Sequence, residues 1–89
     1  MEDNRTAFIN KEVNVNSYYF AKTKNFKTFP KQIEFDGTNY TFIENGLRYL
    51  VRRGQELIEL FDMSDGRTTY RLRLEAGHWT LVTKKPSVA

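Results

Sequence analysis

The stretch DGRTTYRLRLEAG, residues 65–77, carries the pattern that decides the fold. Apolar and polar residues alternate within it: Tyr70, Leu72 and Leu74 fall on one face, and Thr69, Arg71, Arg73 and Glu75 fall on the other. Because successive side chains of an extended chain point to opposite faces, this period of two predicts a half-buried β-strand. Asp65-Gly66 and Gly77 bound the strand, and such residues tolerate the positive φ of a tight hairpin turn. The stretch therefore predicts one amphipathic strand between two chain reversals.

The same succession of turn and strand repeats along the chain. Five glycines stand 8 to 12 residues apart among polar residues that favour turns, at positions 37, 46, 54, 66 and 77. Turn signals at this spacing are typical of consecutive antiparallel strands. Alternating segments between them predict six strands, over residues 32–36, 39–44, 47–52, 56–63, 68–75 and 78–84. Since sheets twist, we expect an all-β antiparallel meander of six or seven short strands, curled into a small, partly closed barrel or sandwich.

Residues 47–63 also fit a second interpretation. Their apolar residues recur at helical spacing, at Leu47, Leu50, Val51, Leu57, Ile58 and Phe61. A helix over 47–63 packed on the sheet would make the fold α+β. Gly54 would then lie inside the helix, where glycine costs about 1 kcal/mol relative to alanine. A hairpin that turns at Gly54 matches the other glycines, and we favour it.

The first 31 residues differ from the rest of the chain. They contain no glycine, and they hold Lys22, Lys24, Lys27 and Lys31 in a stretch, residues 18–31, that has no acidic residue. Val13 and Val15 alternate with asparagines, which is typical of a strand. The sequence therefore predicts a basic N-terminal arm over 1–31 with room for an edge strand at 13–20, a meander core over 32–85, and a C-terminal tail over 86–89.

Composition narrows the chemistry. The 89 residues include no cysteine and a single histidine, His78, which excludes the common Cys/His zinc sites. No serine stands in a nucleophile-elbow sequence, and the glycines are never clustered as in a phosphate-binding loop. We therefore expect a protein that is not an enzyme and that binds no cofactor and no metal.

Cysteine usage and hydropathy also suggest a compartment. The absence of cysteine favours a reducing environment. Residues 1–4 are polar and acidic, unlike a signal peptide, and no run approaches the roughly 18 apolar residues of a membrane span. We expect a cytoplasmic protein that does not engage a membrane.

Two kinds of partner remain. The strands expected over 39–44, 56–63 and 78–84 are apolar on both faces, and aromatic residues make up 15% of the chain. A second apolar face favours binding to another protein or to a second copy of the chain. The alternative partner is single-stranded nucleic acid, because basic residues interleaved with Phe26 and Phe29 could contact phosphates while rings stack on bases. The candidate surface for it comprises Lys22, Lys24, Lys27, Arg48, Arg52, Arg71 and Arg73.

Overall fold

The computed structural model describes residues 5–20, 28–43 and 46–87. They form an all-β fold of seven antiparallel strands, which confirms the predicted class. The strands are β1 (Ala7–Phe20), β2 (Thr28–Phe35), β3 (Thr38–Thr41), β4 (Leu47–Arg53), β5 (Glu56–Ser64), β6 (Thr68–Glu75) and β7 (His78–Pro86). The helix considered over 47–63 is wrong, because β4 and β5 pair as a hairpin that reverses at Gly54, where φ is +64°.

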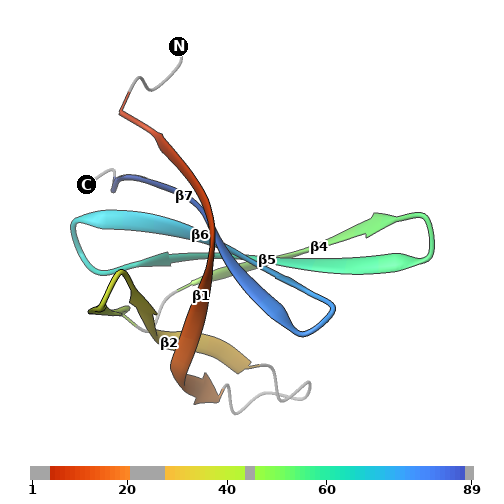
Figure 1. Ribbon diagram of the computed structural model, residues 1–89, viewed down its shortest axis with the longest axis horizontal. Coiled ribbons are helices and arrows are strands. Elements are labelled where there is room, and N and C mark those ends of the chain that lie inside the picture. The colour runs from red at the N-terminus through yellow and green to blue at the C-terminus, as the bar shows by residue number, and fades with distance from the viewer. Residues whose placement is uncertain (1–4, 21–27, 44–45, 88–89) are drawn as a thin grey trace.

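The strands lie in the order β3-β2-β1-β7-β6-β5-β4, and the sheet that they form folds into two layers (Figure 1). The 14-residue strand β1 belongs to both of them, because its first half pairs with β7 and its second half pairs with β2. Irregular pairings along β1 let it bend from a five-stranded sheet into a three-stranded one. After β3, the Ile43 N–H donates to the Ser64 carbonyl at 2.8 Å and ties the small sheet to the end of β5. The result is a sheet folded over itself, and it is not a closed barrel.

Two predicted boundaries need correction. The strand expected at an edge over residues 13–20 runs from Ala7 to Phe20 and lies between β2 and β7, in the middle of the strand order. The tail expected over 86–89 begins later, because Pro86 belongs to β7 and the Ser87 N–H donates to the Arg67 carbonyl at 2.8 Å. Residues 88–89 lie outside the described part of the chain. Alternation shows which face a side chain takes, but it carries no information about which strands flank it.

The core lies between the two layers. Its buried members are Val13, Ile33, Phe42, Phe61, Met63, Tyr70, Leu72 and Leu81. Phe61 on β5 joins the layers, because its ring meets Phe29 of β2 edge-on at 5.8 Å and packs against Trp79 of β7 at 5.2 Å between centroids. Aromatic pairs at such distances add to the gain from area burial. Trp79 itself is only partly buried.

The turn between β5 and β6 is held by the Asp65 carboxylate. One oxygen accepts hydrogen bonds from the Arg67 and Thr68 N–H groups at 2.9 and 2.8 Å, and the other accepts one from the Tyr70 hydroxyl at 3.1 Å. Burial opposes ionisation of Asp65, but these hydrogen bonds outweigh it and hold the carboxyl pKa below its usual 3.8. Burial, together with the Asp65 hydrogen bond, raises the pKa of Tyr70 to about 12. The turn is therefore anchored directly to the core.

We expect Asp65→Asn to lower the free energy of unfolding at pH 7 by about 1–2 kcal/mol, because the amide replaces a charged acceptor of three hydrogen bonds. The folded-state pKa lies below the unfolded one, so the carboxylate stabilises the protein above about pH 4 and loses this effect as the pH falls further. Urea unfolding of both proteins across pH 3–7 should show their difference shrinking on the acid side. Asp36→Asn, in the exposed β2–β3 turn, is the matched control and should change stability by less than about 0.5 kcal/mol. A difference that stays constant with pH would contradict this role of the carboxylate.

Candidate functional site

The β4–β5 hairpin extends away from the body of the molecule (Figure 1, green). β4 stands at one end of the strand order, so β5 is its one pairing partner among the described strands. The ladder between them runs through seven residue pairs, from Leu47↔Asp62 to Arg53↔Glu56, without a register shift. The hairpin is therefore regular, and every residue of β4 except the partly buried Arg48 is exposed.

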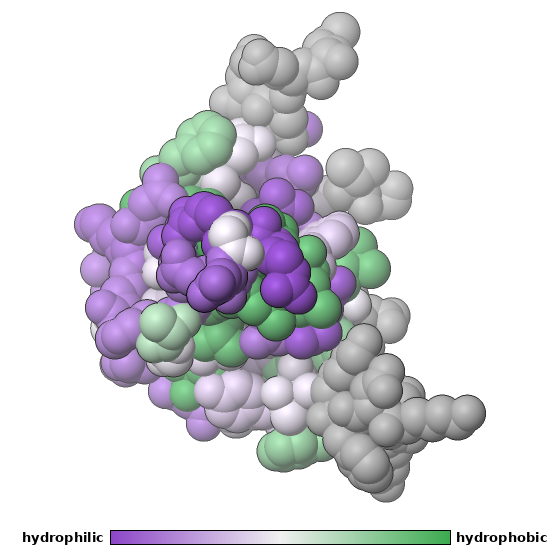
Figure 2. All heavy atoms as spheres, turned by 90° about the vertical axis from the view of Figure 1, so that its right-hand side faces the viewer, coloured by the Kyte–Doolittle hydropathy of each residue, from purple (hydrophilic) through white to green (hydrophobic). Residues whose placement is uncertain are grey.

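Exposed apolar side chains gather on this hairpin. Those exposed by 40–60% in this region are Ile43, Leu47, Tyr49, Leu50, Val51 and Leu57. They lie on both faces: Leu47, Tyr49 and Val51 share one face of β4, and Leu50 shares the other with Leu57 across the ladder. Figure 2 looks onto this end of the molecule and shows hydrophobic side chains bordering the hydrophilic tip. A hairpin that is apolar on both faces leaves unusually large apolar area in contact with water.

The backbone of β4 offers hydrogen bonds along its free edge. Arg53 and Glu56 flank the two-residue turn, and the pair that closes such a hairpin is hydrogen-bonded. Since hydrogen-bonded and non-hydrogen-bonded pairs alternate in an antiparallel ladder, the N–H and C=O groups of Arg48, Leu50 and Arg52 are expected to face away from β5. An edge of this kind is a template for a further strand.

The edge strand at the other end of the strand order, β3, is protected against pairing with a further strand. β3 is only four residues long, and Thr38, Asn39 and Thr41 make it mainly polar. Immediately after it, the Phe42 and Ile43 N–H groups donate to Lys31 and Ser64 carbonyls, both at 2.8 Å. Short, polar edge strands prevent unwanted pairing. β4 is longer than β3 and free of proline and bulges, and it carries four exposed apolar residues beside its three arginines.

Carboxylates neutralise most of the charge on and beside the hairpin. On the core-facing side, Arg48 pairs with Glu59. On the outer face, Arg71 holds both Asp62 oxygens at 2.8 Å and lies over the Tyr49 ring at 5.7 Å. The hydrogen bonds that Arg71 donates to the Asp62 carboxylate raise the pKa of the Arg71 guanidinium. Arg48 and Arg71, two arginines of the candidate basic surface, are thus engaged within the sheet.

The predicted basic surface does not come together as one patch. Arg48 and Arg52 lie on the face of the sheet that also carries Phe61, whereas Arg71 and Arg73 lie on the opposite face. Arg73 approaches Glu75 at 3.6 Å, and Glu75 also accepts from Arg53 at 2.7 Å. The remaining members, Lys22, Lys24 and Lys27, lie outside the described residues. Alternation within one strand predicts the face on which an arginine lies. The carboxylate that pairs with it can come from a neighbouring strand, and which carboxylate that is depends on the register between the strands.

The alternation of the sequence predicts β5, over 56–63, as apolar on both faces, but it does not predict this for β4, which it marks chiefly by its arginines. The signal for this site was Leu50, which stands between Arg48 and Arg52 on the more polar face of its strand. An apolar residue there is unexplained by the half-buried pattern. Recognising it as exposed required knowing that β4 is an edge strand, which the strand order alone reveals.

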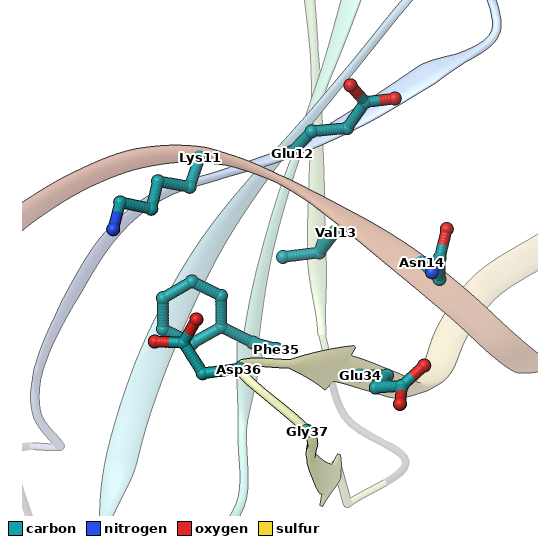
Figure 3. A pocket seen from close by; sticks show the side chains of 8 residues that line it. All are labelled: Lys11, Glu12, Val13, Asn14, Glu34, Phe35, Asp36 and Gly37. Carbon is teal, nitrogen blue, oxygen red and sulfur yellow. The ribbon is translucent and has the colours of Figure 1, made fainter.

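Apart from the β4–β5 hairpin, a depression lies between β1 and the β2–β3 turn (Figure 3). It has a volume of about 440 Å³ and is open to solvent. Val13 and Phe35 point into it, while Glu12 and Glu34 point away. Lys11 and Asp36 supply opposite charges at its border. No set of convergent polar groups marks it as a ligand site.

Residues 5–20, 28–43 and 46–87 hold no group of three His, Cys, Asp or Glu side chains that could bind a metal ion. Within the same ranges, every buried side-chain nitrogen and oxygen has a hydrogen-bond partner. These described residues contain no helix that is long and apolar enough to cross a membrane. No protein-family model, curated protein or solved structure matches the chain.

Proposed function

We propose that the protein is a non-enzymatic protein-binding module of the cytoplasm, in which the β4 edge receives an extended segment of a partner as an additional strand. The observation that carries this proposal is a seven-residue, bulge-free edge strand that exposes apolar side chains on both faces, beside its three arginines. In strand addition, backbone hydrogen bonds supply affinity, and alternate side chains supply specificity. The absence of cysteine supports the assignment to a reducing compartment.

Energetics favour a covered hairpin over a bare one. Apolar surface left in water forgoes roughly 25 cal/mol for each Å² that a partner could bury. Among the described strands β4 pairs with β5 alone, and an isolated two-stranded hairpin is marginally stable. An added strand would supply β4 with a second ladder and cover Leu50 and Tyr49. The bound segment should itself be extended, with apolar side chains at alternate positions.

The charge distribution supports a protein partner over nucleic acid. Affinity for a polyanion depends on cations that are free to meet phosphates. Arg48, Arg71 and Arg73 each contact a carboxylate of the same sheet. Their positive fields are compensated locally, and they lie on opposite faces of the sheet.

Peptide selection tests the proposal. A random peptide library panned against the sparsely immobilised protein, with Leu50→Pro as the counter-selection target, should enrich peptides of micromolar affinity. Proline removes an N–H that faces away from β5, so the hairpin should survive while the edge is blocked. Bound peptides should slow amide hydrogen exchange at Arg48, Leu50 and Arg52 by about tenfold or more.

The matched control is Phe20→Lys, which removes a side chain that is 72% exposed at the end of β1, in the three-stranded sheet that does not contain β4. Selected peptides should bind this variant as tightly as they bind the unaltered protein. Peptides that bind Leu50→Pro equally well, or a selection that enriches nothing over it, would refute strand addition at β4.

A further inference from the structure

We propose that the strand added to β4 is β4 of a second copy of this chain, related by a twofold axis that passes beside Tyr49. This inference rests on the proposed function, because it names the partner for the same edge. The two five-stranded sheets would then join into one continuous antiparallel sheet of twice the width. Such a contact is isologous, since the same strand serves on both sides.

The sequence of β4 is self-complementary in one register. With Tyr49 opposite Tyr49 of the second copy, Leu47 faces Val51, and Arg48 faces Leu50. The outward N–H and C=O groups of Arg48 then meet those of Leu50 in the second copy, as an antiparallel ladder requires, whereas Arg52 falls opposite position 46, just before β4. Every exposed apolar residue of β4 gains a cross-strand neighbour, and no two arginines stand opposite one another.

Neighbouring registers are less favourable. A twofold axis at Leu50 sets Arg48 opposite Arg52 twice, and like charges directly opposite are destabilising. An axis at Val51 sets Tyr49 opposite Arg53 and leaves Leu47 beyond the paired region. Charge and apolar pairing therefore agree on the axis beside Tyr49.

Electrostatics permit the close approach of two copies at this point. Arg48 lies one residue from the axis, and its charge is already compensated by Glu59 of its own chain. Tyr49 packs against Arg71, which in turn is held by Asp62. The centre of the interface would thus bring together two locally neutral surfaces.

Pairing would cover apolar surface on both faces of β4. The apolar side chains of β4 are each 40–60% exposed, and they border the paired strands on the two sides of the sheet. Because an edge contact is narrower than the broad interface of an obligate dimer, a dissociation constant in the micromolar range is expected.

Sedimentation equilibrium of the full chain, from low micromolar to submillimolar concentration, tests dimerisation. We expect a monomer–dimer equilibrium, and we expect Leu50→Pro and Leu50→Lys each to raise the dissociation constant by about tenfold or more. Phe20→Lys, the exposed control on β1, should leave it unchanged. Thermal unfolding of each variant at low concentration verifies that the monomer is folded. A chain that stays monomeric throughout, or a dimer that both Leu50 variants leave intact, overturns the proposal.

Disulfide scanning tests the register, since the chain has no cysteine of its own. Tyr49→Cys should form a symmetric intermolecular disulfide in a glutathione redox buffer, because opposite residues of a non-hydrogen-bonded pair lie about 4.5 Å apart between Cα atoms. Leu50→Cys, Val51→Cys and the β5 control Leu57→Cys should each cross-link at least about fivefold less. Equal cross-linking at all four positions, or a preference for position 50 or 51, overturns the axis at Tyr49. A monomer that still binds selected peptides at β4 overturns the dimer alone and leaves the proposed function standing, whereas a monomer that binds none overturns both.

Discussion

Replacing Phe61 with alanine should lower the free energy of unfolding by about 3–5 kcal/mol, the largest effect expected of any single change in this protein. Phe61 is only 2% exposed and contacts a ring in each layer, Phe29 in one and Trp79 in the other. Truncation removes the favourable transfer free energy of the ring and leaves a cavity between the two layers. For a domain whose total stability is about 5–15 kcal/mol, the loss approaches global unfolding. Urea unfolding followed by tryptophan fluorescence measures it, since Trp79 is the one tryptophan of the chain.

Leu57→Ala is the matched control on the same strand. Leu57 lies four residues before Phe61 on the same face of β5, but it is 49% exposed. Its truncation should cost less than about 1 kcal/mol when measured at a concentration where the chain is monomeric. Equal costs at the two positions would mean that the boundary between the core and the projecting part of β5 is misplaced.

The second large effect is expected at Gly46, and the same substitution at Gly37 is its control. Gly46→Asn should destabilise the protein by about 1–3 kcal/mol, because a Cβ built on Gly46 would lie 2.1 Å from the Met63 sulfur and 3.2 Å from the Asp62 carbonyl oxygen. Met63 is 1% exposed, so its side chain has little room to move away. Gly37→Asn should cost less than about 1 kcal/mol, since φ is +74°, a Cβ there meets nothing within 4 Å, and asparagine tolerates left-handed backbone.

Thermal unfolding of the two asparagine variants provides the comparison. The melting temperature of Gly46→Asn should fall by several degrees more than that of Gly37→Asn, at roughly 4–8 °C for each kcal/mol in a domain of this size. The reverse order would show that backbone conformation, and not close packing against β5, governs both positions.

β5 connects the core to the candidate binding edge. Its second half buries Phe61 and Met63 between the layers, and its ladder with β4 runs from Glu56 to Asp62. Because the ladder is regular along its whole length, the edge is presented by a continuous strand and not by a loop. Binding surfaces on regular elements are held in place before the partner arrives, which reduces the entropy lost on association.

Much of the fold could be read from local patterns. Alternation over residues 68–75 and the reversal at Gly54 correctly distinguished strands from a helix, because side-chain period and turn chemistry are properties of neighbouring residues. Local patterns do not show why each glycine is needed. Asn45-Gly46 has the composition of a turn, like Asp36-Gly37, yet Gly46 is required by the close approach of Met63, a residue seventeen positions away.

The candidate site could be predicted only in part. An apolar surplus that favours a protein partner was visible in the sequence, but its location was not. The four arginines of the predicted surface were correctly placed on their strands, and their separation onto two faces and their pairing with Asp62, Glu59 and Glu75 were not predictable. Those pairings depend on register between strands, which no single segment encodes.

The sequence by itself determined that this chain is built of short antiparallel strands reversed at turn-forming residues, since both features follow from local side-chain alternation and backbone preference. Only the tertiary structure decided which strands lie in the middle and which at the edges. It placed β1 centrally and left β4 open, because the order of strands is set by non-local hydrogen bonding and by the burial of Phe61 and its neighbours between two layers. The exposed edge, on which the proposed function depends, is a consequence of that order.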